Sequence, residues 1–294
     1  MASVCGETWF HFFLKETLMG LSWVSFLPET RQDLLVSIRM CKLLAQCQLD
    51  TVKGNAFLYA VPEAISALTI IMLHISSNSS SQQTMVLAVL ETLAVLLRAI
   101  AGSLWNPHHV AQALQALQAV PLRNLLTRED HDVFHAYHEI LHCILQLHPQ
   151  VMLKASASFL CAIRHLLHSV MREGRQKADT NSYESDKDWV LRSAQSMERL
   201  YCQVAACAAN FTALASFLVA EYVDELQKVT LRTDVKRHLS EGIFAVLDVC
   251  READLNMLRT CLSPGVQEIF RHLYTDFQRF HQYKTRVRAD TEDV

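Results

Sequence analysis

The sequence predicts an all-α protein, built as a HEAT- or armadillo-like helical solenoid or as an irregular helical stack. Hydrophobic residues make up 51% of the 294 residues, enough to bury a sizeable core. Only seven glycines and six prolines interrupt the chain, whereas a β-rich fold of this length would need many more turn residues. Apolar residues recur with the helical period in one segment after another. Helices must therefore carry most of the backbone.

The expected helices are placed by their apolar stripes and by the capping and proline signals between them. Pro28, Asn106-Pro107, Pro149 and Pro264 stand where a helix is expected to start or stop. Short connections between long helices favour antiparallel neighbours. The expected helices cover residues 7–22, 29–49, 55–76, 83–103, 107–118, 128–148, 149–172, 187–228, 232–250, 253–262 and 264–284. We expect the longest of them to break near Asn210.

Two polar segments separate these helices as loops. Residues 76–83 read SSNSSSQQ, and residues 174–187 read GRQKADTNSYESDK. The second loop is the one credible boundary, between a helical repeat region at 1–173 and a C-terminal helical region at 188–294. We interpret it as an exposed loop of one continuous solenoid, and a join between two lobes is the alternative. The helix at 85–101 is apolar around most of its circumference, as an inner solenoid helix or the central helix of a bundle would be.

Composition and motifs argue against several classes of function. The net charge of −3 argues against a body that binds nucleic acid by electrostatics alone. Nine cysteines without a CxxC pair indicate reduced thiols in a cytosolic or nuclear protein. The chain contains no GxSxG, GxGxxG, GxxxxGK[ST] or HExxH motif and no EF-hand loop. We therefore predict a protein that is not an enzyme and has no cofactor or small-molecule ligand.

Three apolar stretches approach the length of a membrane span. Residues 56–75 and 85–102 contain charged residues, and residues 204–220 are short and include polar positions. A span needs about twenty apolar residues with few charges. We therefore predict three buried helices and no membrane partner.

The most polar cluster is a ridge of four histidines, His131, His135, His138 and His142. At 100° per residue they fall within about 60° of one another on a helix. Histidines at i and i+4 can share a zinc ion, but four on one helix cannot converge on one tetrahedral centre. We interpret this histidine ridge as solvated or partner-facing and predict no metal site.

The last two long helices carry narrow apolar stripes. Ser263-Pro264 supplies an N-cap candidate and a proline at the first helical position. The stripe of the last helix comprises Val266, Ile269, Phe270, Leu273, Phe277 and Phe280, and that of the preceding helix Val235, Leu239, Ile243, Val246, Leu247 and Cys250. The candidate partner-contact surface is the exposed face of the last helix, with Arg271, Tyr274, Asp276, Arg279, Tyr283 and Lys284.

Residues 277–288 interleave aromatic rings with cations, a mixture typical of RNA-binding segments. Phe277 and Phe280 belong to the apolar stripe, however, which removes them as stacking platforms. Cations near a helix C-terminus also complement the helix dipole, and the tail at 290–293 adds acidic residues. Direct rRNA contact and a solvated helix end are both open at this point.

Two short motifs in the last two long helices, the closing block at residues 239–283, resemble those of a known family. Gly242, Ile243, Phe244, Val246, Leu247 and Asp248 match a Gly-Ile-aromatic-hydrophobic-hydrophobic-Asp run, and Phe270, Arg271, Leu273, Tyr274, Asp276 and Phe277 match a Phe-basic-x-Leu-Tyr-x-Asp-aromatic core. This block resembles the C-terminal signature of the unhealthy ribosome biogenesis protein 2 homologues. Departures are Arg271 in place of the usual lysine, an altered turn at 258–262, and a closing HQYK where the family tends to have a basic-Trp ending. The resemblance is clear over about sixty residues, and upstream of Trp189 only the helical texture agrees.

The resemblance implies a non-catalytic scaffold in nucleolar assembly of the large ribosomal subunit precursor, with a role in rRNA processing. The implied location is the nucleus and nucleolus. The implied partners are other assembly factors of a pre-ribosomal particle, including an RNA helicase. Family members are much longer, and an apolar helix so close to Met1 suggests a fragment or short product of a longer protein. The alternative is a generic cytosolic armadillo- or HEAT-type adaptor unrelated to ribosomes.

Overall fold

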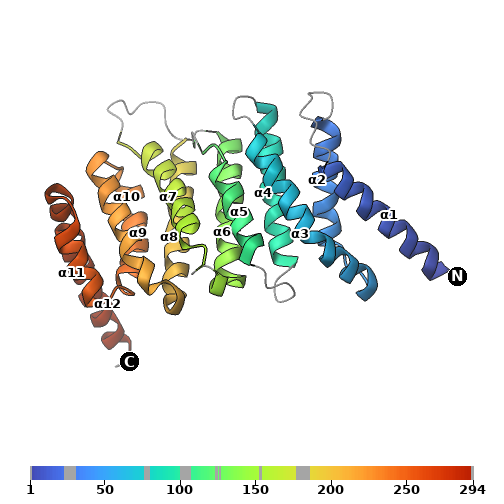
Figure 1. Cartoon of the computed structure of the whole chain (residues 1–294). Helices are drawn as coiled ribbons and strands as arrows, with labels where there is room; N and C mark the ends of the chain where they lie inside the picture. Colours follow the sequence, from blue (N-terminus) through green and yellow to red (C-terminus); the bar gives the residue numbers. More distant parts are fainter. Residues whose placement is uncertain are drawn as a thin grey trace. The chain divides into compact units, whose positions relative to one another are not determined.

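The computed structural model describes residues 2–22, 31–75, 80–99, 107–122, 125, 127–151, 154–176 and 186–292. Within these residues the chain forms twelve α-helices and one 3-10 turn, and its only β-type pairing is an isolated bridge between Arg175 and Leu231. The predicted all-α class is therefore confirmed. The chain divides into two compact units, Met1–Leu166 and Leu167–Val294, and Figure 1 labels their helices.

The first unit is a stack of helices in two layers (Figure 1). In one layer α2 packs on α4 and α4 on α6, and in the other α1 packs on α3 and α3 on α5. Contact between every second helix is how helical repeats bury a continuous core. The elements are α1 (Ala2–Ser22), α2 (Arg31–Gln46), α3 (Thr51–His74), α4 (Ser80–Ala99), α5 (Pro107–Gln118), α6 (Arg128–Leu147), the turn η2 (Pro149–Val151) and the start of α7 (Ser156–Glu173).

Local capping explains two helix starts of this unit. The carboxylate of Asp50 accepts a hydrogen bond of 2.9 Å from the backbone N–H of Lys53, so α3 begins four residues before the expected start. Thr127 and Asp130 form a reciprocal capping box at the start of α6. The apolar helix α4 packs between α2 and α6, which accounts for its apolar residues around most of its circumference.

The second unit contains the rest of α7 and the helices that follow. Within it α8 packs on α10, and α9 packs on α10, α11 and α12. The elements are α8 (Asp186–Ala206), α9 (Ala208–Lys228), α10 (Thr233–Leu247), α11 (Glu252–Cys261) and α12 (Pro264–Glu292). The start of α12 at Pro264 is the one that the proline predicted.

Several predicted boundaries differ from the structure. The expected helix 187–228 is divided at Cys207, close to the expected break at Asn210. The expected helix 149–172 begins as a 3-10 turn, and its α-helix starts only at Ser156. Of the predicted loop 174–187, residues 177–185 lie outside the described residues. The preceding residues pair with the α9–α10 connection, where Arg232 N–H donates to the Gly174 carbonyl over 2.9 Å. The division between the two compact units falls inside α7.

In the described parts of the chain, two helices are long and apolar enough to cross a membrane by length and composition, α3 and the Gln82–Ala99 part of α4. About half of each apolar window is buried, 44% in α3 and 56% in α4. The core helix of a soluble protein passes the same test. The third stretch, 204–220, is interrupted at Cys207. The absence of a membrane partner stays a prediction.

Candidate functional site

The apolar stripe of α12 attaches this helix to the second unit. Val266, Phe270 and Leu273 are buried, as the helical period predicts. Phe277 and Phe280 are only half-buried, and their ring centroids lie 5.9 Å and 5.4 Å from that of Phe244 on α10. Both rings therefore belong to helix packing, as expected, although the stripe opens towards solvent at its C-terminal end.

The predicted partner-contact residues divide into three groups. Arg271, Asp276 and Arg279 are exposed on one face of α12. Tyr274 is half-buried, and the side chains of Tyr283 and Lys284 lie outside the described residues. The structure therefore supports an exposed polar stripe at residues 268–279, shorter than the predicted face.

The cations of this polar stripe are paired with acids of the same helix. Arg271 contacts Glu268 one turn earlier, and Arg279 lies 3.6 Å from Asp276. Such i,i+3 pairs on an exposed surface contribute little to stability, and they lower the net positive potential of the stripe. Its recognition chemistry is that of a mixed-charge protein surface.

Tyr274 is held between aromatic neighbours and a cation. Its ring centroid lies 6.0 Å from that of Phe270 and 5.6 Å from that of Phe277. The guanidinium of Arg259 lies 5.1 Å from the Tyr274 ring centroid, a cation–π contact. Tyr274 therefore joins α11 to α12, because Arg259 lies in the last turn of the α11 helix.

The glycine of the closing block lies where two helices approach closely. A Cβ atom placed on Gly242 of α10 would come within 3.0 Å of the Cα of Glu198 and 3.0 Å of Cδ2 of Tyr201, both on α8. Ile243 next to it is fully buried. Gly242 and Ile243 therefore specify the packing of α8 on α10 and do not form a binding site themselves.

The histidine ridge on α6 differs from the prediction in one member. His135 is exposed and His131 and His142 are half-buried, but His138 is buried, with 7% of its surface exposed. The rings of His138 and His142 are stacked with centroids 6.2 Å apart. The description of the whole ridge as solvated is therefore wrong, because α6 is packed on more than one side. No group of three metal-ligating atoms within 4.8 Å involves this ridge among the described residues.

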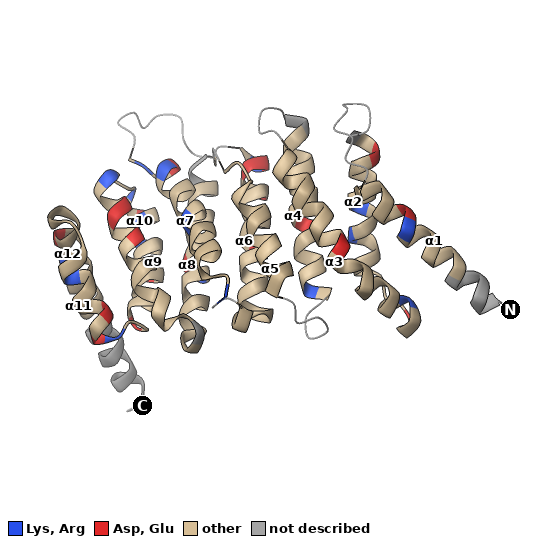
Figure 2. Ribbon diagram, in the orientation of Figure 1, with Lys and Arg blue, Asp and Glu red and all other residues tan. Residues whose placement is uncertain are grey.

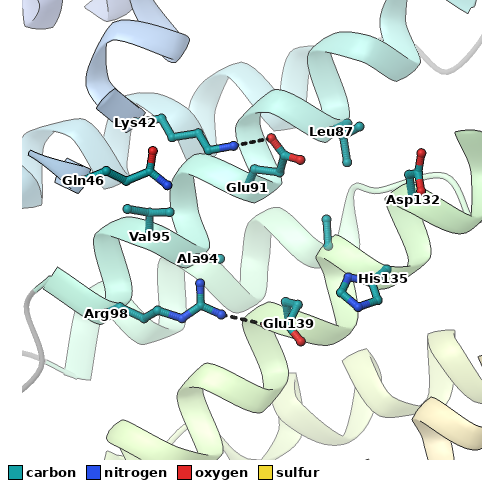
Figure 3. Close-up of a pocket in the computed structure, with 11 residues that line it drawn as sticks. Lys42, Gln46, Leu87, Glu91, Ala94, Val95, Arg98, Asp132, His135 and Glu139 are labelled. Atoms are coloured by element: carbon teal, nitrogen blue, oxygen red, sulfur yellow. Dashed lines mark hydrogen bonds and ion pairs between the residues drawn. The ribbon is translucent and has the colours of Figure 1, made fainter. Parts of the chain in front are cut away.

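A polar groove crosses α2, α4 and α6 of the first unit (Figure 3). Its volume is about 450 Å³. Lys42 Nζ lies 2.6 Å from Glu91 Oε2, and Arg98 Nη2 lies 2.7 Å from Glu139 Oε2. The lining residues are Lys42, Gln46, Leu87, Glu91, Ala94, Val95, Arg98, Asp132, His135, Ala136 and Glu139. The groove therefore combines an apolar floor with two ion pairs that tie neighbouring helices together.

The sequence predictions missed this groove, although a signal for it was present. Glu91 and Arg98 are the only two charged residues of α4. They are seven residues apart, so they lie on the same face of the helix. Charges confined to one face of an otherwise apolar helix indicate where that helix meets solvent or a charged partner. Their partners Lys42 and Glu139 stand 49 and 41 residues away in the chain, and no local pattern connects them.

Two clusters in the second unit combine a histidine with two carboxylates. His168 on α7 lies near Glu221 and Glu225 on α9, and Glu198 on α8 lies near His238 and Glu241 on α10. In each cluster the ligand atoms lie within 4.8 Å of one another. Each cluster joins two helices that are separated by one helix along the chain.

The first helix exposes large aromatic side chains. Trp9, Phe12 and Phe13 of α1 have 59%, 52% and 49% of their surface exposed, and their rings contact one another. Exposed apolar clusters of this kind favour association with another surface.

Charged residues elsewhere are dispersed. In Figure 2 basic and acidic positions are scattered over the helices, and most of the ribbon carries neither. Among the described residues, no helix presents an all-basic face of the kind that binds a phosphate backbone. The candidate surfaces are therefore the mixed-charge stripe of α12 and the groove of α2, α4 and α6.

Comparison with known proteins bears on the chain as a whole. A designed armadillo repeat protein in complex with the peptide (KR)4 aligns with a TM-score of 0.36 and 13% identity, over 90% of this chain and 99% of that chain. This likeness is too distant to bear on the fold or on a ligand. The family model for the Urb2/Npa2 family, which is linked to ribosome biogenesis, matches residues 84–286. That match covers more than half of the chain and includes the closing block, so the chain belongs to the Urb2/Npa2 family.

Proposed function

We propose that the protein is a non-catalytic helical scaffold in nucleolar assembly of the large ribosomal subunit precursor. The observation that carries this proposal is the match to a ribosome-biogenesis family over residues 84–286. Stacked helices that expose polar stripes and grooves suit a protein that holds other factors in place. The scaffold acts in the nucleus, within a particle that contains other assembly factors, an RNA helicase among them.

The stripe of α12 binds a protein partner and does not grip the rRNA backbone. Its described arginines are neutralised by Glu268 and Asp276, whereas binding to phosphates needs a surplus of cations. Arg271 and Arg279 remain exposed, with 69% and 75% of their side-chain surface accessible. They can therefore exchange their weak pairing within the helix for pairing with a partner.

Depletion of the protein followed by RNA blotting of ribosomal precursors tests the function. We expect large-subunit precursors to accumulate and small-subunit precursors to be processed normally. Normal processing of both classes, or exclusion of a tagged chain from nucleoli, would overturn the proposal in favour of an adaptor role elsewhere in the cell.

Charge reversal tests the α12 surface separately. The double variant Arg271→Glu, Arg279→Glu is expected to reduce co-sedimentation with pre-ribosomal particles without loss of helicity. The matched control is Arg128→Glu on α6, where an exposed arginine also faces an acid of its own helix, Asp132, at 4.0 Å. Equal loss in the control, or no loss in the double variant, would rule out the stripe as the contact surface.

A further inference from the structure

We propose that Glu198, His238 and Glu241 form a binding site for one divalent transition-metal ion, with Zn²⁺ as the best match. His238 and Glu241 lie on α10 in an i,i+3 arrangement, and Glu198 faces them from α8. Their ligand atoms all lie within 4.8 Å of one another. One imidazole and two carboxylates are ligand types that zinc accepts, with water in the fourth position.

The geometry needs only a small adjustment to receive the ion. In a tetrahedral zinc site with bonds of about 2.0–2.2 Å, neighbouring ligand atoms stand about 3.4 Å apart. His238 Nδ1 now donates a hydrogen bond to Glu198 Oε2 over 2.6 Å. The ion would take the place of that bridging proton, with the imidazole proton held on Nε2 and both Glu198 and Nδ1 turned to the metal. Side-chain rotations supply this opening, and the helices do not have to move apart.

The site is pre-organised by the close approach of its two helices. A Cβ on Gly242 would come within 3.0 Å of the Cα of Glu198, so α10 lies close against α8 next to the ligands. His238 is partly buried, with 15% of its side-chain surface exposed, and Glu198 has 28% exposed. Ligands fixed on packed helices lose little conformational entropy when an ion binds.

Glu241 is the residue that distinguishes this cluster from an ordinary ion pair. Its side chain is half-buried, and it forms no hydrogen bond or ion pair with any residue in the described parts of the chain. No lysine or arginine there lies within 4.0 Å of Glu198 or Glu241, so Glu198 has only the His238 imidazole as a charged neighbour and Glu241 has none. A divalent cation would neutralise both, which a single histidine does not.

The second cluster provides an internal comparison. His168 Nε2 already lies 2.9 Å from Glu221 and 3.2 Å from Glu225. Lys228 Nζ lies 2.6 Å from the same Glu225 oxygen, and hydrogen bonds to Asp224 and Glu225 raise the pKa of Lys228, which stays charged. The Lys228 ammonium therefore already neutralises the Glu225 carboxylate, which a metal ion would otherwise do. This cluster is complete as an ion-pair network, and we expect it to bind no zinc.

Titration of Zn²⁺ into the full chain, stripped with EDTA and followed by calorimetry at pH 7.5, tests the site. We expect one ion per chain, and slower hydrogen exchange in α8 and α10 on binding, because the ion joins the two helices. Glu241→Gln should weaken the affinity at least about tenfold, since a neutral amide replaces an anionic ligand. Because Glu241 has no partner in the metal-free protein, this variant should melt at the temperature of the metal-free wild type.

Two control variants locate the ion. His168→Gln removes the histidine of the second cluster, and His142→Gln removes a member of the histidine ridge, where paired histidines attract zinc adventitiously. Both should bind Zn²⁺ as the wild type does. The proposal is overturned if the wild type shows no saturable binding, if Glu241→Gln binds unchanged, or if either control loses the ion.

Discussion

Alanine at Gly242 is expected to destabilise the second unit, although the same substitution at Gly54 should stabilise the first. Both glycines lie inside helices, where replacement by alanine contributes about 0.5–1 kcal/mol through backbone entropy. At Gly54 of α3 the nearest atom to a new Cβ is Leu49 Cβ at 4.0 Å, an ordinary contact. The stabilisation from reduced backbone entropy is therefore retained in full in Gly54→Ala.

At Gly242 the new methyl group meets two atoms that cannot give way. The Cα of Glu198 is backbone, and Tyr201 is buried with 1% of its surface exposed. Overpacking of this kind costs about 1–3 kcal/mol, which exceeds the gain from helix propensity. We expect a net loss of about 1 kcal/mol for Gly242→Ala and a gain of about 1 kcal/mol for Gly54→Ala, a difference of about 2 kcal/mol.

Hydrogen exchange measured by mass spectrometry separates the two effects because it resolves α3 from α8 and α10. Exchange in α8 and α10 should accelerate about fivefold in Gly242→Ala, and exchange in α3 should slow by a similar factor in Gly54→Ala. Thermal melts by circular dichroism should move in opposite directions, by about 2–4 °C for each 1 kcal/mol. A slower exchange in α8 and α10, or a higher melting temperature, for Gly242→Ala would refute the close packing of α8 on α10.

Three further outcomes follow from named contacts. Phe244→Ala removes the ring that Phe277 and Phe280 pack against, and should lower the free energy of unfolding in urea by about 3 kcal/mol. If Phe244→Ala lowered this free energy less than Phe280→Ala, which removes a half-buried ring, the packing described above would be contradicted. A double-mutant cycle at Lys42 and Glu91 should give a coupling of about 0.2–1 kcal/mol, because both side chains are partly solvated, and a larger value would show a rigid, dry pair. At pH 8 a maleimide should label the exposed Cys202 but not Cys41. The thiolate is the reactive form of cysteine, and burial raises the pKa of the Cys41 thiol to about 12. Equal labelling rates for the two cysteines in the folded protein would count against the burial of Cys41.

The closing block shows why sequence patterns located the helices so well. The period of Val266, Phe270 and Leu273 places three apolar groups on one side of a helix, whatever that side faces. Pro264 and the capping box at Thr127 act within four residues of themselves. Signals of this range are complete in the local sequence. The start of α3 moved because the cap at Asp50 added a turn before the apolar stripe began.

Longer-range features were out of reach for the same reason. The histidine ridge was predicted to be solvated or partner-facing because its four members share one face, but His138 is buried, since α6 has neighbours on several sides. The carboxylate that faces His238 comes from Glu198, forty residues earlier in the chain. Nothing in the spacing of either residue indicates the other.

The sequence alone determined that the chain is helical, where most helices begin and end, and which family it belongs to, because periodicity, caps and signature letters are local properties. Only the tertiary structure decided which helices pair, that α2, α4 and α6 share a polar groove, and that Gly242 brings α8 against α10 with Glu198, His238 and Glu241 beside it. The physical reason is that ion pairs, ligand sets and close backbone contacts depend on distances in space between residues 40 or more positions apart. Those distances are set by the packing of the whole unit and by no single segment of it.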